Sequence, residues 1–466
     1  MGYGPDARWL SVGTAILAAL LVSCSDGDRG PIETFRNPPE IASHDGVLDA
    51  TLTIGPATLD IAGETVAFPA LYDGLYVPPV LRVNPGDVVR LGVDNGGEHG
   101  TNLHYHGFNV SPQPGSDDVF LVIDPGSGYR YDMPIPADHP VGLFWYHPHV
   151  HPYVNTEIAG GLSGGIIVGD LLAPFPELRD IPERVMLLKD LKTVDGAPDP
   201  DPDPSGPTTR TINGLFQPQI VMRPGQIELW RIGNVGANIY YRLRMDGQPF
   251  YVIAQDGNLQ NQAVEAESLL LPPGKRLELL VYGPAAGSYE LVAEPYQTGP
   301  DGDSYPGQRL AAVVSAGTPV SPTPLPAQFP VVRDLRTATI AKQRTVRFAD
   351  TPDPNVFVID GRPYDEGCVN TLVPLGTVER WEVLNEATEE HVFHIHQIDF
   401  QVTEIDGVEQ PFVGRQDTVN LPSAHTDPAT GAVVPSSVTL VLPFTDPLIV
   451  GEFVYHCHIV QHADQG

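Results

Sequence analysis

The sequence predicts an all-β protein built from three β-sandwich domains of one type. Glycine and proline are frequent, with 47 and 49 of the 466 residues, which is typical of many short strands joined by turns. No long amphipathic helical pattern stands out. A chain of this length exceeds a single ordinary core, so several domains are expected, and an internal repeat indicates three.

Each copy of the repeat consists of a turn, a strand with rough alternation of apolar and polar residues, and a closing Asn. The three copies occupy residues 85–95, 224–234 and 375–385. They lie a domain length apart, which indicates repeated domains rather than a solenoid. The predicted domains cover residues 48–172, 173–316 and 331–466.

Two proline-rich segments fall outside the expected strands. Residues 317–330 are predicted to form an extended linker between the second and third domains. The run of alternating Asp and Pro at 199–205 cannot pair within a central strand, so a loop early in the second domain is expected there.

An apolar run from Trp9 to Val22 has the length of a signal peptide and is short for a membrane span. The segment Leu21-Val22-Ser23-Cys24 resembles a bacterial lipobox. We therefore expect removal of residues 1–23, lipidation of Cys24 and a flexible tether over 24–47, with the protein periplasmic or at the cell surface. An ordinary secretion signal cut elsewhere is the alternative.

The formal net charge of -32 argues against a nucleic acid or an anionic membrane surface as partner. Solubility is the simplest interpretation of this acidity, although it is compatible with attraction of cationic substrates. We expect a monomer. Beyond Cys24 the chain has only Cys368 and Cys457, and the histidines flanking Cys457 favour a metal role over a disulfide.

Four His-x-His pairs carry the candidate chemistry. They are His104 and His106, His147 and His149, His394 and His396, and His456 and His458. Residues two apart in an extended strand project from the same face, so each pair directs two imidazoles one way. Cys457, in the middle of the last pair, must point the opposite way. Imidazole suits copper, zinc, iron and nickel, and a thiolate beside histidines narrows the choice toward copper.

The pairs lie in the first and third predicted domains, and the middle domain contains no histidine. A site built from all four pairs must therefore lie where the first and third domains meet, a common place for cofactors. On the opposite face of the last strand, His462 can curl back toward Cys457. His391 can supply a second imidazole from a neighbouring strand, as a blue-copper site requires.

The motifs HYHG at 104–107, WYHPH at 145–149, HVFHIH at 391–396 and HCHIVQH at 456–462 resemble the four copper motifs of the multicopper oxidases. The three repeats resemble that family's three cupredoxin-like domains, which are Greek-key β-sandwiches. The resemblance implies four copper ions. It implies a type 1 copper bound by His391, Cys457 and His462, a type 2 copper bound by His104 and His394, and a type 3 pair bound by His106, His147, His149, His396, His456 and His458.

The resemblance also implies an activity. Members of the family couple one-electron oxidation of a reductant at the type 1 copper to four-electron reduction of O₂ to water. The leading hypothesis is a laccase-like oxidase of phenols or similar small reductants. A metallo-oxidase acting on Cu(I), Fe(II) or Mn(II) is the second hypothesis. A copper-free structural member is the third, and the complete set of ligands disfavours it. The motifs do not reveal the physiological substrate, because loops over the type 1 site select it.

Four carboxylates next to the motifs are candidate proton or substrate residues. Asp117 and Asp118 resemble by position the family's proton donor near the type 2 copper. Glu389 and Glu390 immediately precede His391, where they could deprotonate a phenol or hold a metal ion. For both pairs, a solvated loop charge is the alternative interpretation.

Three positions depart from the family pattern. The first motif has Tyr105 where the family usually has Trp, which is a conservative change. Many relatives carry an acidic residue directly after the final histidine, where this chain has Ala463 followed by Asp464. Proton delivery to the type 3 pair is therefore unassigned. The family's axial type 1 residue would fall about five positions after His462, beyond Gly466, so no axial ligand or redox potential is assigned.

Overall fold

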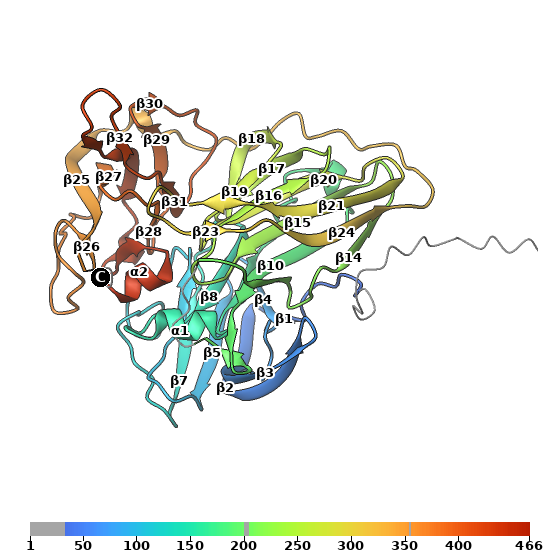
Figure 1. Ribbon diagram of the computed structural model, residues 1–466, viewed down its shortest axis with the longest axis horizontal. Helices are drawn as coiled ribbons and strands as arrows, with labels where there is room; N and C mark the ends of the chain where they lie inside the picture. The colour runs from blue at the N-terminus through green and yellow to red at the C-terminus, as the bar shows by residue number, and fades with distance from the viewer. Residues whose placement is uncertain (1–32, 200–204, 354–355) are drawn as a thin grey trace, which may run out of the picture. The chain divides into compact units, whose positions relative to one another are not determined.

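The computed structural model describes residues 33–199, 205–353 and 356–466. The predicted signal peptide, Cys24 and most of the Asp-Pro run at 199–205 lie outside the described residues. Nearly all regular structure in the described part consists of strands, which confirms the all-β fold class. The larger sheets form three pairs along the chain, coloured blue to cyan, green to yellow and orange to red in Figure 1. No helix in the described ranges has the length and apolar character needed to cross a membrane.

The first sandwich consists of a five-stranded and a four-stranded sheet with Leu52, Leu91 and Tyr131 buried between them. In sheet order the strands are β1 (Glu40–Ala42), β4 (Val80–Val83), β9 (Gly164–Val168), β8 (Gly142–His147) and β6 (His104–His106), then β3 (Glu64–Tyr72), β2 (Val47–Ile61), β5 (Val88–Asn95) and β7 (Gly128–Pro134). Strands β6 and β8 pair antiparallel with His104 opposite His147, so two histidine motifs share one sheet edge.

The second sandwich consists of a six-stranded and a five-stranded sheet. In sheet order the strands are β13 (Thr209–Ile212), β10 (Glu183–Leu191), β15 (Ile227–Asn234), β20 (Arg276–Tyr282), β17 (Phe250–Gln255) and β18 (Asn258–Ala266), then β14 (Gln219–Met222), β24 (Gln308–Ser315), β21 (Gly287–Glu294), β16 (Tyr241–Met245) and β19 (Leu269–Leu271). Every residue of β15 is buried, although its sequence predicts only rough alternation. The reason is that β8 of the first sandwich also packs against β15 and β20.

The third sandwich consists of a six-stranded and a three-stranded sheet. In sheet order the strands are β26 (Phe357–Ile359), β25 (Ile340–Asp350), β27 (Thr377–Asn385), β34 (Ser436–Phe444), β29 (Gln401–Ile405) and β30 (Val408–Glu409), then β31 (Thr418–Leu421), β28 (His391–Ile395) and β35 (Tyr455–Cys457). Strands β28 and β35 pair with His394 opposite His456 and Phe393 opposite Cys457. The three-stranded sheet therefore carries the histidine motifs of this domain.

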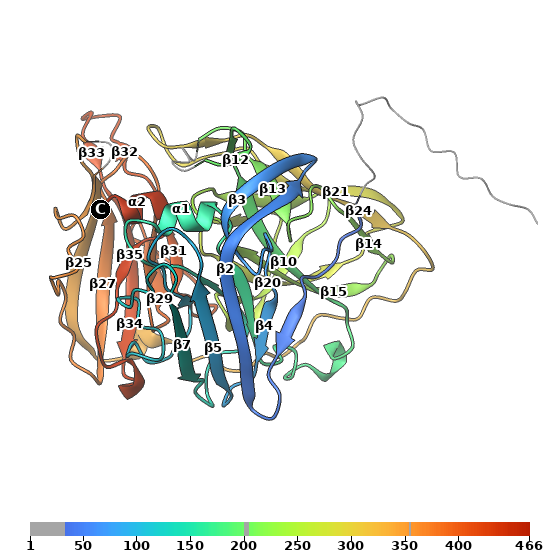
Figure 2. The ribbon, with the colours of Figure 1, turned by 90° about the horizontal axis from the view of Figure 1, so that it is seen from below.

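Short helices and two-stranded sheets accompany the larger sheets. They are α1 (Val154–Ala159), α2 (Val460–Asp464), η1 (Pro176–Leu178), η2 (Leu335–Thr337), η3 (Pro447–Ile449), β11 (Thr193–Val194), β12 (Ala197–Pro198), β22 (Tyr296–Gln297), β23 (Ser304–Tyr305), β32 (His425–Thr426) and β33 (Val433–Val434). Helix α1 follows the second histidine motif and helix α2 follows the last one, and the two helices lie side by side (Figures 1 and 2). The Asp464 carboxylate accepts the Asn155 amide at 2.6 Å, which joins the two helices.

The threefold repeat reflects a shared structure. Its closing residues Asn95, Asn234 and Asn385 are all buried and make the same contacts. The Asn95 side-chain Nδ2 donates to the carbonyls of His99 and Ile123, and its Oδ1 accepts the amide two residues later. The other two asparagines repeat this pattern. This Asx turn starts the loops that lead to β6 and β28, where the histidines begin.

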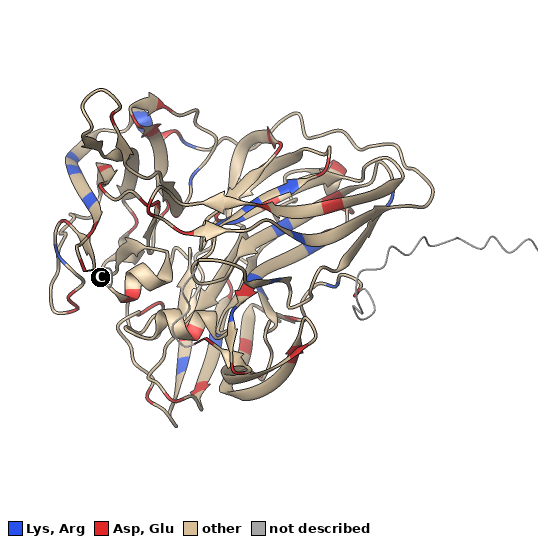
Figure 3. Cartoon of the chain, in the orientation of Figure 1, with Lys and Arg blue, Asp and Glu red and all other residues tan. Residues whose placement is uncertain are grey.

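The described part of the predicted tether is not a free linker, so the expectation of flexibility is wrong for residues 33–47. Strand β1 pairs in parallel with β4. Phe35 is buried, and its amide donates to the Gln219 carbonyl in the second sandwich. Arg82 forms ion pairs with Glu40 and Glu183 at 2.6 and 2.8 Å. Figure 3 shows basic and acidic residues spread along the strands of all three sandwiches.

The predicted linker at 317–330 contains no helix or strand. It is fixed to the second sandwich, since the Val320 amide donates to the Pro224 carbonyl and the Tyr282 hydroxyl donates to the Thr323 carbonyl. Leu325 also packs against the apolar residues of that sandwich. The connection is therefore extended and attached.

Candidate metal centre

Strand β35 and the residues after it present two opposed faces. Cys457 faces His391 and His462, whereas the rings of His456 and His458 face histidines of the first sandwich. The strand ends at Cys457, earlier than the extended run that the sequence predicted, because helix α2 begins at Val460. This helix is what returns His462 to within 3.8 Å of the Cys457 Sγ atom, measured to its Nδ1 atom.

A first group of candidate ligands consists of His391, Cys457 and His462, all buried. The two Nδ1 atoms lie 3.4 Å apart, and all three ligand atoms lie within 4.8 Å of one another. Phe357 stacks on His462 at a centroid distance of 3.8 Å. The Val392 amide donates to the Cys457 Sγ atom at 3.5 Å. A thiolate with two imidazoles is the donor set of a blue-copper site.

A second group consists of eight histidines from the first and third sandwiches. They are His104, His106, His147, His149, His394, His396, His456 and His458. The rings of β6 stack directly on those of the β28 motif, His104 on His396 at 3.9 Å and His106 on His394 at 3.8 Å. The structure thus brings the four pairs together between the two domains that the sequence indicated.

Three of these rings are anchored at one nitrogen and leave the other without a partner. The Nδ1 atoms of His104, His147 and His394 are hydrogen-bonded, the first to Asp117 at 3.0 Å and the other two to main-chain carbonyls at 2.8 and 2.9 Å. Their buried Nε2 atoms have no partner among the described residues. An unsatisfied buried nitrogen is costly, and a ring fixed through one nitrogen with the other free is the usual arrangement of a metal ligand.

The remaining rings face one another through nitrogen atoms. The Nε2 atom of His456 lies 3.3 Å from those of His149 and His396, and the Nε2 atom of His458 lies 3.1 Å from Nδ1 of His106. Two nitrogens bound to one ion at about 2.0–2.1 Å stand roughly 3–3.5 Å apart in tetrahedral geometry. The residues therefore fit copper ions placed between these rings.

The protonation of the cluster also suits metal binding. Burial is the main cause that lowers the pKa of seven of these rings, and neighbouring histidines lower it further in most of them. The pKa lies well below the usual range for six of them and falls to about 3 for His147. Imidazoles must be neutral to bind a metal ion, and these seven rings are neutral at physiological pH.

Two residues that the motifs did not reveal hold the cluster in place. The Asp417 carboxylate accepts a hydrogen bond from Nε2 of His106 at 3.2 Å, and the Asp417 carbonyl accepts one from Nδ1 of His394. Arg276 of the histidine-free middle sandwich donates to both carboxylate oxygens at 2.9 and 2.6 Å. Burial alone would raise the pKa of Asp417, but Arg276 and His106 hold it well below its usual range. No local pattern marks either residue, because they meet only in the fold.

Of the two predicted aspartates, only Asp117 contacts the cluster. Its carboxylate accepts hydrogen bonds from His104 Nδ1 at 3.0 Å, the Tyr105 amide at 2.9 Å and Gln397 Nε2 at 2.8 Å. Burial raises the pKa of Asp117 to about 7. The Asp118 carboxylate instead accepts the Phe120 amide and caps its own turn.

The two predicted glutamates lie at the edge of the first ligand group and are half-buried. Glu389 Oε1 lies 3.9 Å from Nε2 of His462. Burial, with a contribution from Asp303, raises the pKa of Glu389 to about 7. Glu390 turns toward the middle sandwich and accepts the Tyr296 hydroxyl at 2.7 Å. Only Glu389 therefore adjoins a candidate copper ligand directly.

Known proteins with this arrangement identify the family. Family models described as multicopper oxidase match residues 54–172, 185–318 and 331–466. The chain belongs to the multicopper oxidase family. Its three sandwiches are accordingly cupredoxin-like domains, and membership indicates a copper-binding oxidoreductase that uses O₂ and a reducing substrate.

Individual relatives are distant but similar over most of their length. A multicopper oxidase of Staphylococcus haemolyticus is 23% identical over 406 residues, covering 85% of this chain and 81% of the relative. The cell division protein FtsP of Escherichia coli is 27% identical over 375 residues, covering 74% and 75%. The solved structure of a Campylobacter jejuni multicopper oxidase, described as a metallo-oxidase, has a TM-score of 0.80 and 25% identity and covers 95% of each chain.

Proposed function

We propose that this multicopper oxidase couples one-electron oxidation of a small reductant, phenolic or similar, to four-electron reduction of O₂ to water. The observation that carries the proposal is the presence of both complete donor sets, joined through consecutive residues of one strand. Bound copper, as one type 1, one type 2 and two type 3 ions, would supply electron transfer and O₂ reduction. The full ligand set argues against a copper-free structural role.

The chain supplies the connection between the two donor sets. Cys457 belongs to the first group, and the adjacent His456 and His458 belong to the second. Covalent bonds therefore link the Sγ atom to both rings, and electrons need not cross solvent. The Val392 amide at Sγ and the pairing of β28 with β35 fix the relative positions of the groups.

Protons for water formation require a group beside the cluster. Asp117 is buried, contacts His104 and has a pKa raised by burial to about 7, so we assign proton delivery to it. Ala463 has no titratable side chain, and Asp464 is engaged with the Asn155 amide at 2.6 Å and lies 3.3 Å from His151 Nδ1.

Glu389 bears on the choice of reductant. A carboxylate beside the His462 edge can accept the proton of a phenol as its electron leaves, which supports a phenol oxidase. The same carboxylate, near Asp303, could hold Cu(I), Fe(II) or Mn(II). That arrangement, with the description of the Campylobacter relative, favours a metallo-oxidase as the second candidate.

Oxygen uptake tests the proposal. Copper-loaded protein should consume one O₂ for every four equivalents of a one-electron donor and release no peroxide, as measured with an oxygen electrode and a peroxide assay. Peroxide as the product, or no uptake with phenols, Fe(II), Cu(I) or Mn(II), would contradict it.

A variant of Glu389 distinguishes the two substrate classes. Glu389→Gln should slow the oxidation of a neutral phenol by about 10²-fold, which is the usual contribution of a general base. The rate of oxidation of a donor that loses no proton should be unchanged. Glu382→Gln, at an exposed position of β27, is the matched control. A loss confined to Fe(II), Cu(I) or Mn(II) would instead favour the metallo-oxidase.

We also propose that the mature chain is an exported monomer, anchored through a lipid on Cys24. Labelled palmitate should be incorporated by the wild-type chain and not by Cys24→Ser. Equal labelling of both would refute the anchor, and sedimentation of the solubilised protein as a dimer would refute the monomer.

A further inference from the structure

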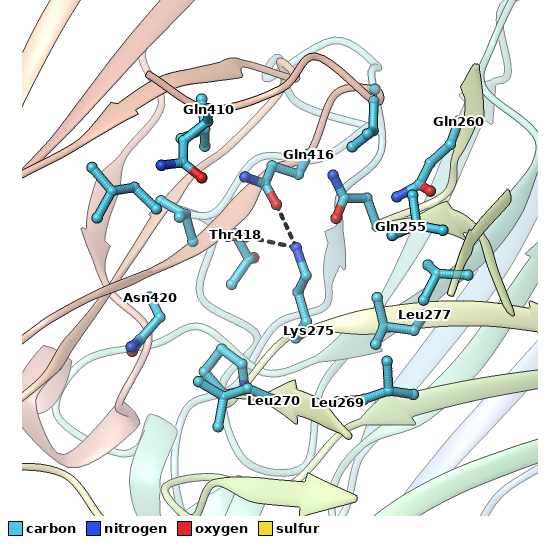
Figure 4. A pocket seen from close by; sticks show the side chains of 18 of the residues that line it. Gln255, Gln260, Leu269, Leu270, Lys275, Leu277, Gln410, Gln416, Thr418 and Asn420 are labelled. Atoms are coloured by element: carbon cyan, nitrogen blue, oxygen red, sulfur yellow. Dashed lines mark hydrogen bonds between the residues drawn. The ribbon is translucent and has the colours of Figure 1, made fainter. Parts of the chain in front are cut away.

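The cavity between the second and third sandwiches does not lead to the first donor group. It has a volume of about 470 Å³, and in Figure 4 Lys275 donates to Gln416 and Thr418 across the seam. Its lining contains none of the three candidate type 1 ligands. A molecule in this cavity therefore does not touch the type 1 site. Among the groups that do touch it are carboxylates at the outer edges of the two imidazoles.

The two imidazoles of the first donor group differ at their outer nitrogens. Their Nδ1 atoms lie 3.4 Å apart on the side of Cys457, which leaves their Nε2 atoms facing outward. With Nδ1 bound to a metal ion, the ring proton of His391 resides on Nε2, which then donates to the Asp350 Oδ1 atom at 3.3 Å. His462 Nε2 lies 3.9 Å from Glu389 Oε1, which exceeds hydrogen-bond distance. Of the two rings, only His391 therefore has a carboxylate hydrogen-bonded at its outer nitrogen.

The end of strand β25 positions this carboxylate. The strand ends at Asp350, and it pairs with β26 so that Asp350 lies opposite Phe357. Phe357 stacks on His462, and the ring of Phe348 meets His391 edge-on at a centroid distance of 5.8 Å. Residues two apart in a strand project from the same face, so Phe348 and Asp350 reach the same imidazole. One strand therefore supplies both an apolar contact and a carboxylate to His391.

The charge of Asp350 is not paired with a basic side chain. Among the described residues, no Lys or Arg forms an ion pair with Asp350, which pairs with His391. A carboxylate that accepts the N–H of a ligating imidazole makes the ring a stronger donor to the metal ion. Its negative charge also stabilises the more positive of two oxidation states, and Cu(II) carries one more positive charge than Cu(I). Both effects lower the reduction potential of a copper ion held by His391.

We propose that Asp350 is a positioning residue that lowers the reduction potential of the type 1 copper by accepting the Nε2–H of His391. This role rests on the proposed function, since it requires copper at the first donor group. It gives the two imidazoles different tasks. His391 is held and adjusts the potential, whereas the outer nitrogen of His462, next to Glu389, remains for the reductant. Because a lower potential makes a weaker oxidant, the role also favours reductants that lose an electron readily, such as electron-rich phenols.

A redox titration of the blue absorption in the copper-loaded full chain tests this role. Asp350→Asn keeps the size of the side chain and an oxygen acceptor but removes the charge. It should shift the Cu(II)/Cu(I) equilibrium about tenfold toward Cu(I), which is a rise of about 59 mV for a one-electron couple. This is the lower end of the usual effect of such partners on metal affinity, because solvent screens a side chain that is 39% exposed. Asp350→Ala, which also lacks the acceptor, should raise the potential at least as far, and Asp350→Glu should restore most of the wild-type value.

Substrate preference gives a second measurement. Asp350→Asn should raise kcat for an electron-poor phenol relative to kcat for an electron-rich one, because the stronger oxidant matters most for the donor that gives up its electron less readily. An unchanged ratio despite a raised potential would contradict the preference for readily oxidised reductants.

Glu386→Gln is the matched control for the loss of a carboxylate. Glu386 is 38% exposed, and its ion pair is with Arg347 at 2.8 Å rather than with a candidate copper ligand. Its replacement should shift the Cu(II)/Cu(I) equilibrium less than about twofold, and copper content verifies that each variant holds the metal. An equally large shift in Glu386→Gln, or an unchanged potential in both Asp350→Asn and Asp350→Ala, would overturn the role of Asp350 alone. A wild-type chain without a blue band would overturn the proposed function and this role with it.

Discussion

Arg276 lies in the middle domain, which carries no candidate copper ligand, yet through Asp417 it fixes two ligands of the other domains. Replacing Arg276 by Met should therefore loosen both ligands. Arg276 donates to both carboxylate oxygens of Asp417. That carboxylate holds His106, and the Asp417 carbonyl holds His394. Met occupies a similar volume without charge, so Arg276→Met leaves a carboxylate buried beside the cluster with its principal counter-charge removed.

The magnitude follows from burial, since the side chains of Arg276 and Asp417 are 0% and 1% exposed. Removing one partner of such a pair costs about 3–5 kcal/mol of unfolding free energy. The double variant Arg276→Met with Asp417→Asn leaves no unpaired carboxylate at this site. Its loss of unfolding free energy should therefore be smaller, by at least about 1.5 kcal/mol, than the sum of the losses in the two single variants. Because Arg276 fixes the carboxylate that orients His106, Arg276→Met should weaken copper binding at the cluster about 10–100-fold.

Urea unfolding of copper-depleted protein measures the stability. Copper content and the electron paramagnetic resonance spectrum, both recorded after dialysis against a chelator, measure how firmly the cluster holds copper. Arg244→Met is the matched control, because the Arg244 side chain is 42% exposed and pairs with Glu294 at the surface, where the loss of an ion pair has little effect on stability. The blue absorption should persist in both variants. The reasoning would be refuted if Arg276→Met had the same urea midpoint as Arg244→Met and kept the electron paramagnetic resonance signal of the type 2 copper.

Three further predictions concern the two donor sets and a buried carboxyl group. Cys457→Ser should abolish the blue absorption band, and a retained band would exclude Cys457 as the type 1 thiolate. His394→Ala should keep the band and abolish O₂ uptake, and unchanged uptake would remove His394 from the cluster. Burial raises the pKa of Glu157 to about 8, above the unfolded value of about 4.3, so its contribution to stability is complete below pH ~4 and is lost as the pH rises to about 8. At about 1.36 kcal/mol per pKa unit, Glu157→Gln should be several kcal/mol more stable than wild type at pH 9 and equally stable near pH 4. The same difference in urea midpoint between Glu157→Gln and wild type at pH 4 and at pH 9 would contradict this.

Local sequence patterns were sufficient to predict the fold class and the convergence of the histidines. The closing asparagines predicted three equivalent domains, because each makes the same short-range Asx turn and sheet contacts. The His-x-His pairs predicted shared faces, because side-chain direction in a strand depends only on spacing. The opposed projection of Cys457 followed from the same rule.

Features that depend on contacts between distant segments could not be predicted in this way. Strand β15 is buried on both faces because the first sandwich covers it, and its own residues do not encode that neighbour. Residues 33–47 look polar and irregular, yet β1 gains a partner in β4. Arg276 and Asp417 are 141 positions apart and meet only after folding. Whether Asp117 or Asp118 contacts His104 was undecidable, because a loop has no fixed side-chain period.

The most direct test of the central claim is an anomalous difference map from crystals of copper-loaded protein, measured on both sides of the copper absorption edge. The account predicts one copper peak among His391, Cys457 and His462 and three peaks among the eight paired histidines between the first and third domains. Copper at only one of these groups, or an empty eight-histidine cluster in an enzyme that still reduces O₂ to water, would contradict it.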